Sequence, residues 1–136
     1  MLDCILILNK SKFIELKIII PFYSNLKIQS FCKEEKIIMK LWLIPFNNKY
    51  KYISPHEKKI SEELPYKRSD NYRFTRGYLR YCLSKVLNLP CEDIPLSSLP
   101  GKHPRLPNKF GYVSISHHSN DVLLIGWSSK KIGVDI

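Results

Sequence analysis

The sequence contains no alanine, few acidic residues and no long apolar run. A membrane-spanning helix needs roughly 20 consecutive apolar residues, and no segment approaches that length. A signal peptide is also not expected, because Asp3 lies where such a peptide is basic and no small-residue cleavage site follows. These absences predict a cytoplasmic protein with no membrane partner.

Cysteine pairs at metal-binding spacing are missing as well. None of the four cysteines, Cys4, Cys32, Cys82 and Cys91, forms a C-x-x-C pair, so neither a zinc site nor a redox centre is indicated. Reduced thiols are the ordinary state of such residues in the cytoplasm.

The charge is strongly positive, with 22 basic against 12 acidic residues and a net charge of +10. Part of this surplus resembles the product of an A/T-rich gene, because lysine and isoleucine each occur 17 times. Arginine is more informative, since none of the five occurs in the first 67 residues. A guanidinium fork suits phosphate or carboxylate, so this cluster predicts an anion site.

A length of 136 residues, 44% of them hydrophobic, predicts one domain with a buried core. Residues 1–38 alternate short Ile/Leu runs with Lys and Glu and predict one or two weak strands. The composition of the sequence changes at Met39. Residues 40–46 predict a strand that ends at a proline. Two interpretations stay open. Residues 1–38 are either an upstream extension of a domain spanning 39–136 or a genuine N-terminal hairpin.

The middle of the chain predicts a long helix that starts at Ser69, with Ser69 or Asp70 as its cap, and ends before Pro90. Apolar or small residues recur there at helical spacing and form one core-facing side. These are Tyr72, Thr75, Leu79, Leu83 and Val86.

Three arginines of this helix, Arg73, Arg76 and Arg80, fall within about a 60° sector beside the apolar side. They are therefore expected at the edge of the buried surface. Gly77 interrupts the helix at a cost of about 1 kcal/mol relative to alanine. We expect another part of the chain to approach its backbone closely.

Residues 90–110 contain five prolines and predict a loop. Three strands should follow, over 112–117, 122–127 and 132–136. The expected fold class is therefore α+β, with a small antiparallel sheet packed on a long helix. Because the last strand would end at the final residue, we expect the domain to be cut short at its C-terminus.

Four residues of this last third suggest chemistry. Ser116 and His117 at a strand end offer a hydroxyl and an imidazole to an anion, and Lys102 offers a cation on a proline-stiffened loop. Asp135, among apolar residues, requires a partner or a cation. Together they suggest a phosphate-rich ligand bridged to a hard metal ion such as Mg²⁺.

In order and spacing these features resemble the 4′-phosphopantetheinyl transferases of the surfactin-synthetase-activating type. The resemblance covers residues 39–136. The matching segments are the strand with Trp42, the helix from Arg73 to Arg80, Gly101-Lys102 with Pro104, Ser114-Ile115-Ser116-His117, and Gly133-Val134-Asp135-Ile136.

The resemblance implies that residues 39–136 form one half of a pseudo-twofold fold, with coenzyme A and Mg²⁺ between the halves. Such enzymes move the phosphopantetheine arm of coenzyme A to a serine of an acyl or peptidyl carrier protein. By resemblance, Lys102, Ser116 and His117 hold the 3′-phosphate side of coenzyme A. Arg73 and Arg76 are further phosphate contacts, placed less closely by the motif.

By the same resemblance, Asp135 would be a Mg²⁺ ligand. The sequence departs from the family pattern in two respects. The glutamate that the family has two residues later would be residue 137, and the second-half motif with the expected base is absent. Residues 127–131 imitate only the opening of that motif and predict a turn. We therefore expect this chain alone to be inactive as a transferase.

Two other classes of function are also compatible with the sequence. A small basic nucleic-acid-binding α+β domain is suggested by the arginines with Tyr72, Tyr78 and Tyr81 nearby, and it predicts steep salt dependence. Nucleic acid is the less favoured partner. A non-catalytic remnant acting as a binding module predicts an exposed apolar patch and self-association.

Overall fold

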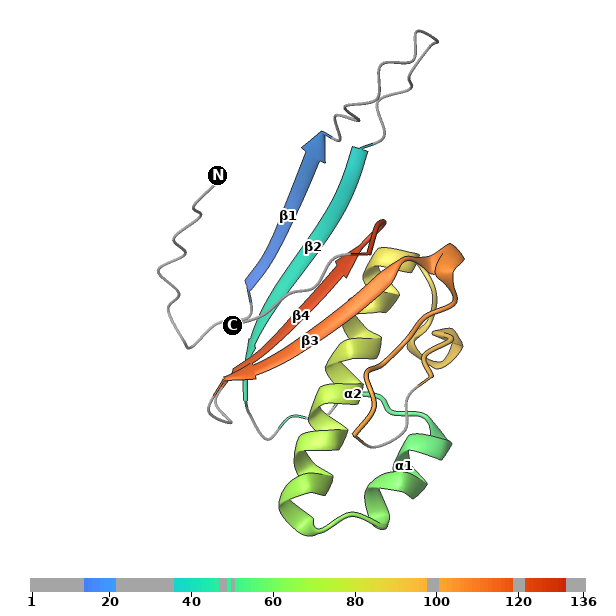
Figure 1. Ribbon diagram of the computed structural model, residues 1–136. Helices are drawn as coiled ribbons and strands as arrows, with labels where there is room; N and C mark the ends of the chain where they lie inside the picture. The colour runs from blue at the N-terminus through green and yellow to red at the C-terminus, as the bar shows by residue number, and fades with distance from the viewer. Residues whose placement is uncertain are drawn as a thin grey trace, which may run out of the picture.

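The structure is a computed structural model that describes residues 14–21, 36–46, 49, 51–97, 101–118 and 122–131, with the backbone alone at 14–21, 36, 37 and 118. An antiparallel sheet lies against one long helix, and a short helix packs beside that helix (Figure 1). The elements are β1 (Ile14–Pro21), β2 (Lys36–Pro45), α1 (Pro55–Glu62), α2 (Tyr66–Leu87), η1 (Cys91–Asp93), η2 (Asn108–Phe110), β3 (Tyr112–His118) and β4 (Val122–Ser128).

The sheet has the order β1-β2-β4-β3, and all neighbouring strands are antiparallel. In the middle of the sheet Trp42 of β2 is opposite Ile125 of β4, which is also opposite Ile115 of β3. The predicted α+β class, with a small antiparallel sheet on a long helix, is thereby confirmed. The expected strand over 132–136 lies outside the described residues.

The sheet includes residues on both sides of Met39. β2 begins at Lys36, which pairs with Pro21 at the end of β1. The described residues Ile14–Pro21 therefore form a strand that pairs with β2, and both interpretations of residues 1–38 stay predictions. That residues 39–136 fold without this strand stays a prediction.

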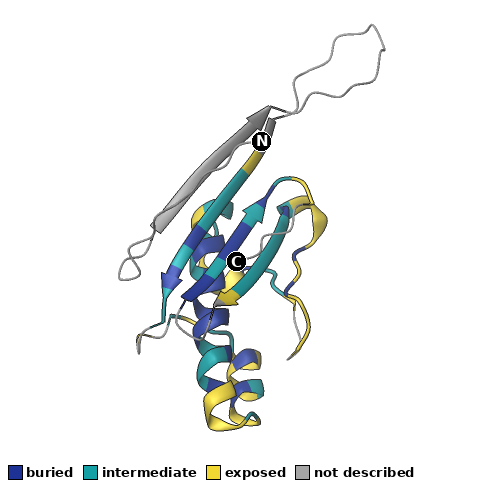
Figure 2. Ribbon diagram, turned by 60° about the vertical axis from the view of Figure 1, so that its left-hand side comes forward, coloured by how far each residue is buried: buried dark blue, intermediate teal, exposed yellow. Residues whose placement is uncertain are grey.

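The core lies between the sheet and α2. Side chains alternate along a strand, so Trp42 and Ile44 of β2 point to the same face and meet Leu79 and Leu83 of α2. All four are at most 1% exposed. Figure 2 shows the buried residues along this contact, whereas the loops and the far side of α1 are exposed. Burial of this apolar contact is the main source of stability.

Helix α2 begins earlier than the sequence predicts. It starts at Tyr66 directly after Pro65, which has no side-chain capping bond, and the backbone N–H of Ser69 donates to the Pro65 carbonyl at 2.8 Å. The predicted cap at Ser69 or Asp70 is therefore wrong, because a proline with fixed φ already suits a helix start. The predicted end is confirmed, since Asn88 closes the helix at φ 53° two residues before Pro90.

Helix α1 was not expected. Ser54 caps it by accepting from the Glu57 N–H at 3.2 Å, and the Ser54 N–H donates to Glu57 Oε2 at 2.8 Å. This reciprocal pair is a capping box, and Pro55 occupies the first turn. The sequence Ser54-Pro55-His56-Glu57 carried the signal for this helix.

Gly77 lies where the segment before α1 crosses α2. A Cβ at this position would be 2.9 Å from the carbonyl oxygen of Lys51. The close backbone approach that the sequence predicts is therefore confirmed. Within the part of the chain that the structure describes, no helix has the length and apolar character needed to cross a membrane.

Candidate anion-binding site

Arg80 is a structural residue. Its Nε donates to Glu57 Oε2 at 2.8 Å, and both side chains are 5% exposed. Its Nη1 also donates to the carbonyls of Cys91 and Ile94, at 3.0 Å each. Arg80 thus joins α2 to α1 and to the segment after α2, and its guanidinium is occupied by protein groups.

Arg73 also joins the two helices, through a neutral partner. Its Nε donates to Ser61 Oγ at 2.8 Å, and that hydroxyl in turn donates to the Lys58 carbonyl. Ser61 is fully buried, whereas Arg73 is half-buried. Arg73 therefore retains a surface on which to meet a ligand, but its position is fixed by α1.

Arg76 is the unusual member of the group. It is only 4% exposed, and its buried Nε has no hydrogen-bond partner among the described residues. Its guanidinium lies 5.0 Å from the ring centre of Tyr72. Among the described residues the core holds two guanidiniums but one carboxylate, Glu57, which already pairs with Arg80. A buried charge without a counter-charge is costly, so Arg76 is suited to receive an anion.

His117, near the end of β3, lies close to this guanidinium. Its Nε2 is 3.0 Å from the Thr75 hydroxyl, and its ring is 6.4 Å from that of Phe46. Partial burial of the ring, and secondly the charge of Arg76, lower the pKa of His117 below its ordinary value. The imidazole is therefore neutral at pH 7, and an arriving anion would favour its protonation. Burial also raises the pKa of Tyr72, which stays a neutral phenol.

Ser116 and His117 lie on opposite faces of the sheet. Successive residues of a strand alternate in direction, and His117 faces α2 through its contact with Thr75. Ser116 is opposite Leu124 of β4, on the other side. The two side chains therefore do not converge on one group.

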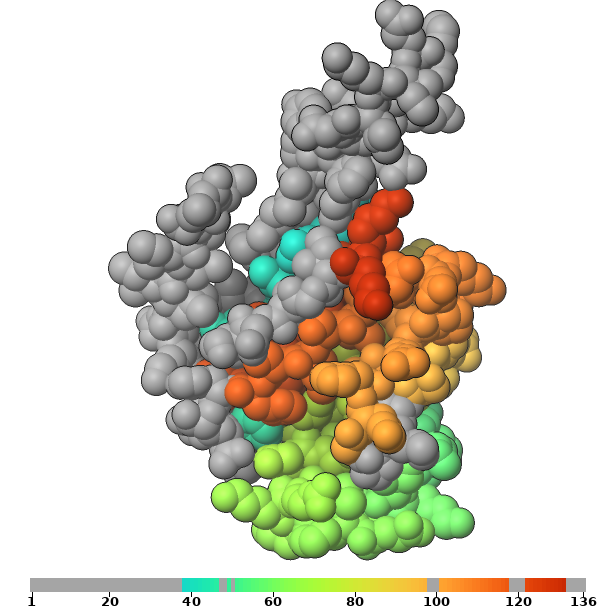
Figure 3. Space-filling view, viewed as in Figure 1, coloured from blue at the N-terminus to red at the C-terminus, as the bar shows by residue number. Residues whose placement is uncertain are grey.

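Lys102 lines a cavity of about 770 Å³ between α1, α2 and the loop before β3. Figure 3 shows the segment after Gly101, in orange, beside α1, in green. His117 is not among the described residues that line it. The lining consists of Ser54, His56, Glu57, Arg80, Leu96, Ser97, Gly101, Lys102, His103 and Arg105. The structure thus places Lys102 and His117 in two different surroundings.

The predicted metal ligand Asp135 lies outside the described residues. Within residues 38–131, as far as they are described, no group of three or more His, Cys, Asp or Glu side chains is placed to hold a metal ion. The described residues therefore offer cationic and neutral groups to a ligand but no set of metal ligands.

Two contributors to the site were missed from the sequence. Thr75 was expected only as a core-facing residue, yet its hydroxyl bonds to His117. Glu57 lies on α1, a helix that the sequence analysis does not predict; it neutralises Arg80, so that Arg76 is the buried cation without a carboxylate partner in the described part of the chain. The capping-box pattern at residues 54–57 is the sequence feature that predicts a helix start with Glu57 in its first turn.

Comparison with known proteins assigns no family. No family model matches the sequence, and no significant match is found to a curated protein or to a solved structure.

Proposed function

We propose that residues 39–136 are one half of a 4′-phosphopantetheinyl transferase, with the corresponding half of the pseudo-twofold fold. The complete enzyme would bind coenzyme A and transfer its phosphopantetheine arm to a serine of an acyl or peptidyl carrier protein. The observation that supports this most is Arg76, a buried guanidinium beside His117 that has no counter-charge among the residues that the structure describes. The motif resemblance implies phosphate contacts at both residues.

The chemistry of the site suits a phosphate. A phosphate oxygen near Arg76 would supply the missing counter-charge, and it would favour the protonated imidazole of His117, which then donates a second charged bond. Each charged hydrogen bond is typically worth about 1.5–3 kcal/mol. Arg73, held by Ser61, would border the same ligand.

Lys102 and Asp135 are the remaining residues with a proposed role in binding. Lys102 would contact another anionic group of coenzyme A from its cavity. Asp135 would be a ligand of Mg²⁺, an ion that in the complete enzyme offsets the charge of the leaving bisphosphate. Because the resemblance places a further metal ligand and the base in residues that this sequence does not contain, the chain alone is expected to transfer nothing.

Calorimetric titration of the chain with coenzyme A tests the proposal. We expect saturable binding, and His117→Ala should weaken it by roughly ten- to a hundredfold. Dephospho-coenzyme A, which lacks the 3′-phosphate, should be nearly indifferent to this change. The absence of binding at millimolar coenzyme A would refute the proposal. A mass increase of a carrier protein treated with this chain alone would show that the chain already contains a complete active site.

The nucleic-acid alternative has less support. Arg76 and Arg80 are each 4% exposed, and Tyr72 and Tyr78 are buried, so most of this group is closed to a nucleic acid. Only Tyr81 of the three tyrosines is half-buried, with Lys51 and Lys85 each 4.4 Å from its ring centre, and a single such ring is a small surface for stacking bases. A titration with single-stranded DNA at two salt concentrations separates the alternatives. Tight binding with a steep salt dependence would favour the nucleic-acid function over coenzyme A.

A further inference from the structure

The cavity that contains Lys102 holds three cationic or titratable side chains that the family motif does not assign. These are His56 at the start of α1, and His103 and Arg105 in the loop before β3. The cavity volume of about 770 Å³ is within the range of small-molecule sites. A ligand that reaches Lys102 would therefore also meet these three residues.

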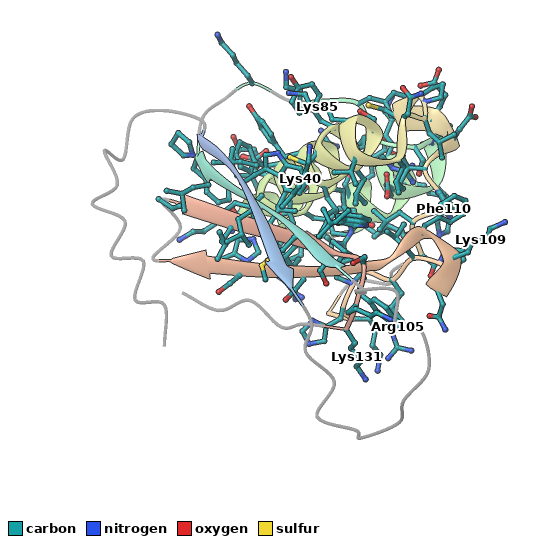
Figure 4. The ribbon with its side chains drawn as sticks, turned by 90° about the horizontal axis from the view of Figure 1, so that it is seen from above. Lys40, Lys85, Arg105, Lys109, Phe110 and Lys131 are labelled. Carbon is teal, nitrogen blue, oxygen red and sulfur yellow. The ribbon has the colours of Figure 1, made fainter. Side chains whose placement is uncertain are left out.

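Arg105 is the best positioned of them. Its N–H donates to the Ser97 carbonyl at 2.9 Å, and the Ser97 N–H donates to the Arg105 carbonyl at 3.0 Å. This two-way bridge closes the base of the loop that carries Lys102. Pro104 and Leu106 on either side are buried. The backbone of Arg105 is thus fixed, while its exposed side chain lies on the opposite side of the molecule from Lys85 (Figure 4).

The charges of the cavity favour an anion. Glu57 is the one acidic residue among the described residues that line it, and its Oε2 already accepts from Arg80 and from the Ser54 N–H. That pair is neutral, so Lys102 and Arg105 leave an excess of positive charge. A concave surface lined by one sign of charge attracts ligands of the other sign.

We infer that this cavity is a second anion subsite, with Arg105 as a specificity-determining residue, and that the ligand carries two separate phosphate groups. One group would meet Arg76 and His117, and the other would meet Lys102 and Arg105. The inference rests on the proposed function in taking the ligand to be phosphorylated. It separates Lys102 from His117, which the motif resemblance places at the same phosphate.

A comparison of two ligands against two variants tests this inference. Coenzyme A and dephospho-coenzyme A are titrated into the wild type, Arg105→Ala and His117→Ala. Each variant should weaken coenzyme A by roughly tenfold or more. Because the subsites read different phosphates, exactly one of the two variants should lose its effect when the 3′-phosphate is absent. Arg68→Ala is the matched control, since Arg68 is exposed and does not line the cavity.

Each of the other possible results of these titrations has its own meaning for the inference and for the proposed function. If both variants lose their effect with dephospho-coenzyme A, or if both keep it, the two residues read one phosphate and the inference is overturned while the proposed function stands. An Arg105→Ala effect no larger than that of Arg68→Ala overturns the inference as well. If coenzyme A does not bind, the titrations are repeated with 3′,5′-ADP and 5′-AMP. The same one-of-two result then supports the subsite without the transferase, and no binding of either nucleotide overturns both.

Discussion

Arg76 and Arg80 lie one helical turn apart on α2 and are equally buried, yet replacing each by methionine should have different consequences. Arg80→Met removes bonds to Glu57, Cys91 and Ile94 and leaves the Glu57 carboxylate buried without a partner. Removal of one partner of a buried ion pair costs about 3–5 kcal/mol of unfolding free energy. We expect a loss of that size for Arg80→Met.

Arg76→Met instead removes a buried charge whose Nε has no partner among the described residues. Methionine fills similar space, and the loss is the contact with the Tyr72 ring, worth about 0.5–2 kcal/mol. Relief of the uncompensated charge offsets that loss. The free energy of unfolding should therefore change by less than about 1 kcal/mol, while the affinity for coenzyme A falls. The two variants should differ in stability by at least about 2 kcal/mol.

Urea denaturation measures this difference, and the fluorescence of the fully buried Trp42 reports unfolding. The two variants are matched in substitution, helix and burial, so each is the control for the other. Failure of Arg80→Met to fold, with Arg76→Met folded, would be the extreme form of the expected result. Equal losses of stability would refute the reasoning, because Arg76 would then be as well paired as Arg80 and could not serve as an anion site.

Two further predictions concern stability. Gly77→Ala should lower the free energy of unfolding by about 1–3 kcal/mol in the same urea experiment, because the new Cβ would be 2.9 Å from the Lys51 carbonyl oxygen; a gain would show that the crossing segment yields easily. The pKa of His117 is lower in the folded chain than the unfolded value of about 6.5, so the unfolded chain takes up the proton first as pH falls. Stability should therefore fall below about pH 6.5, and less so in His117→Gln; equal pH profiles would contradict the assignment.

Local sequence patterns predict much of the fold. Apolar spacing located the core side of α2, where Leu79 and Leu83 are fully buried. Gly77 was recognised as a place of close approach because a helix seldom includes glycine without a packing reason. The start of α2 was misplaced since Ser69 imitates a cap, and α1 was missed although its capping box is legible at Ser54 and Glu57.

The candidate site was harder to predict from the sequence, because its properties depend on contacts between segments that lie far apart along the chain. Sequence spacing placed Arg73, Arg76 and Arg80 together, but it gave no means of telling them apart. Their different roles arise from partners on α1, namely Ser61 for Arg73 and Glu57 for Arg80. The contact between Thr75 and His117 spans 42 positions and follows only from the packing of β3 against α2.

The strand order has a consequence for how this sequence can diverge. β1 forms one edge of the sheet, and β3, with His117, forms the other. Two central strands, β2 and β4, separate the N-terminal strand from the candidate anion site (Figure 1). Substitutions in β1 and at the site should therefore combine independently. Binding of the ligand should therefore constrain the residues of β1 less than it constrains the residues at the opposite edge of the sheet.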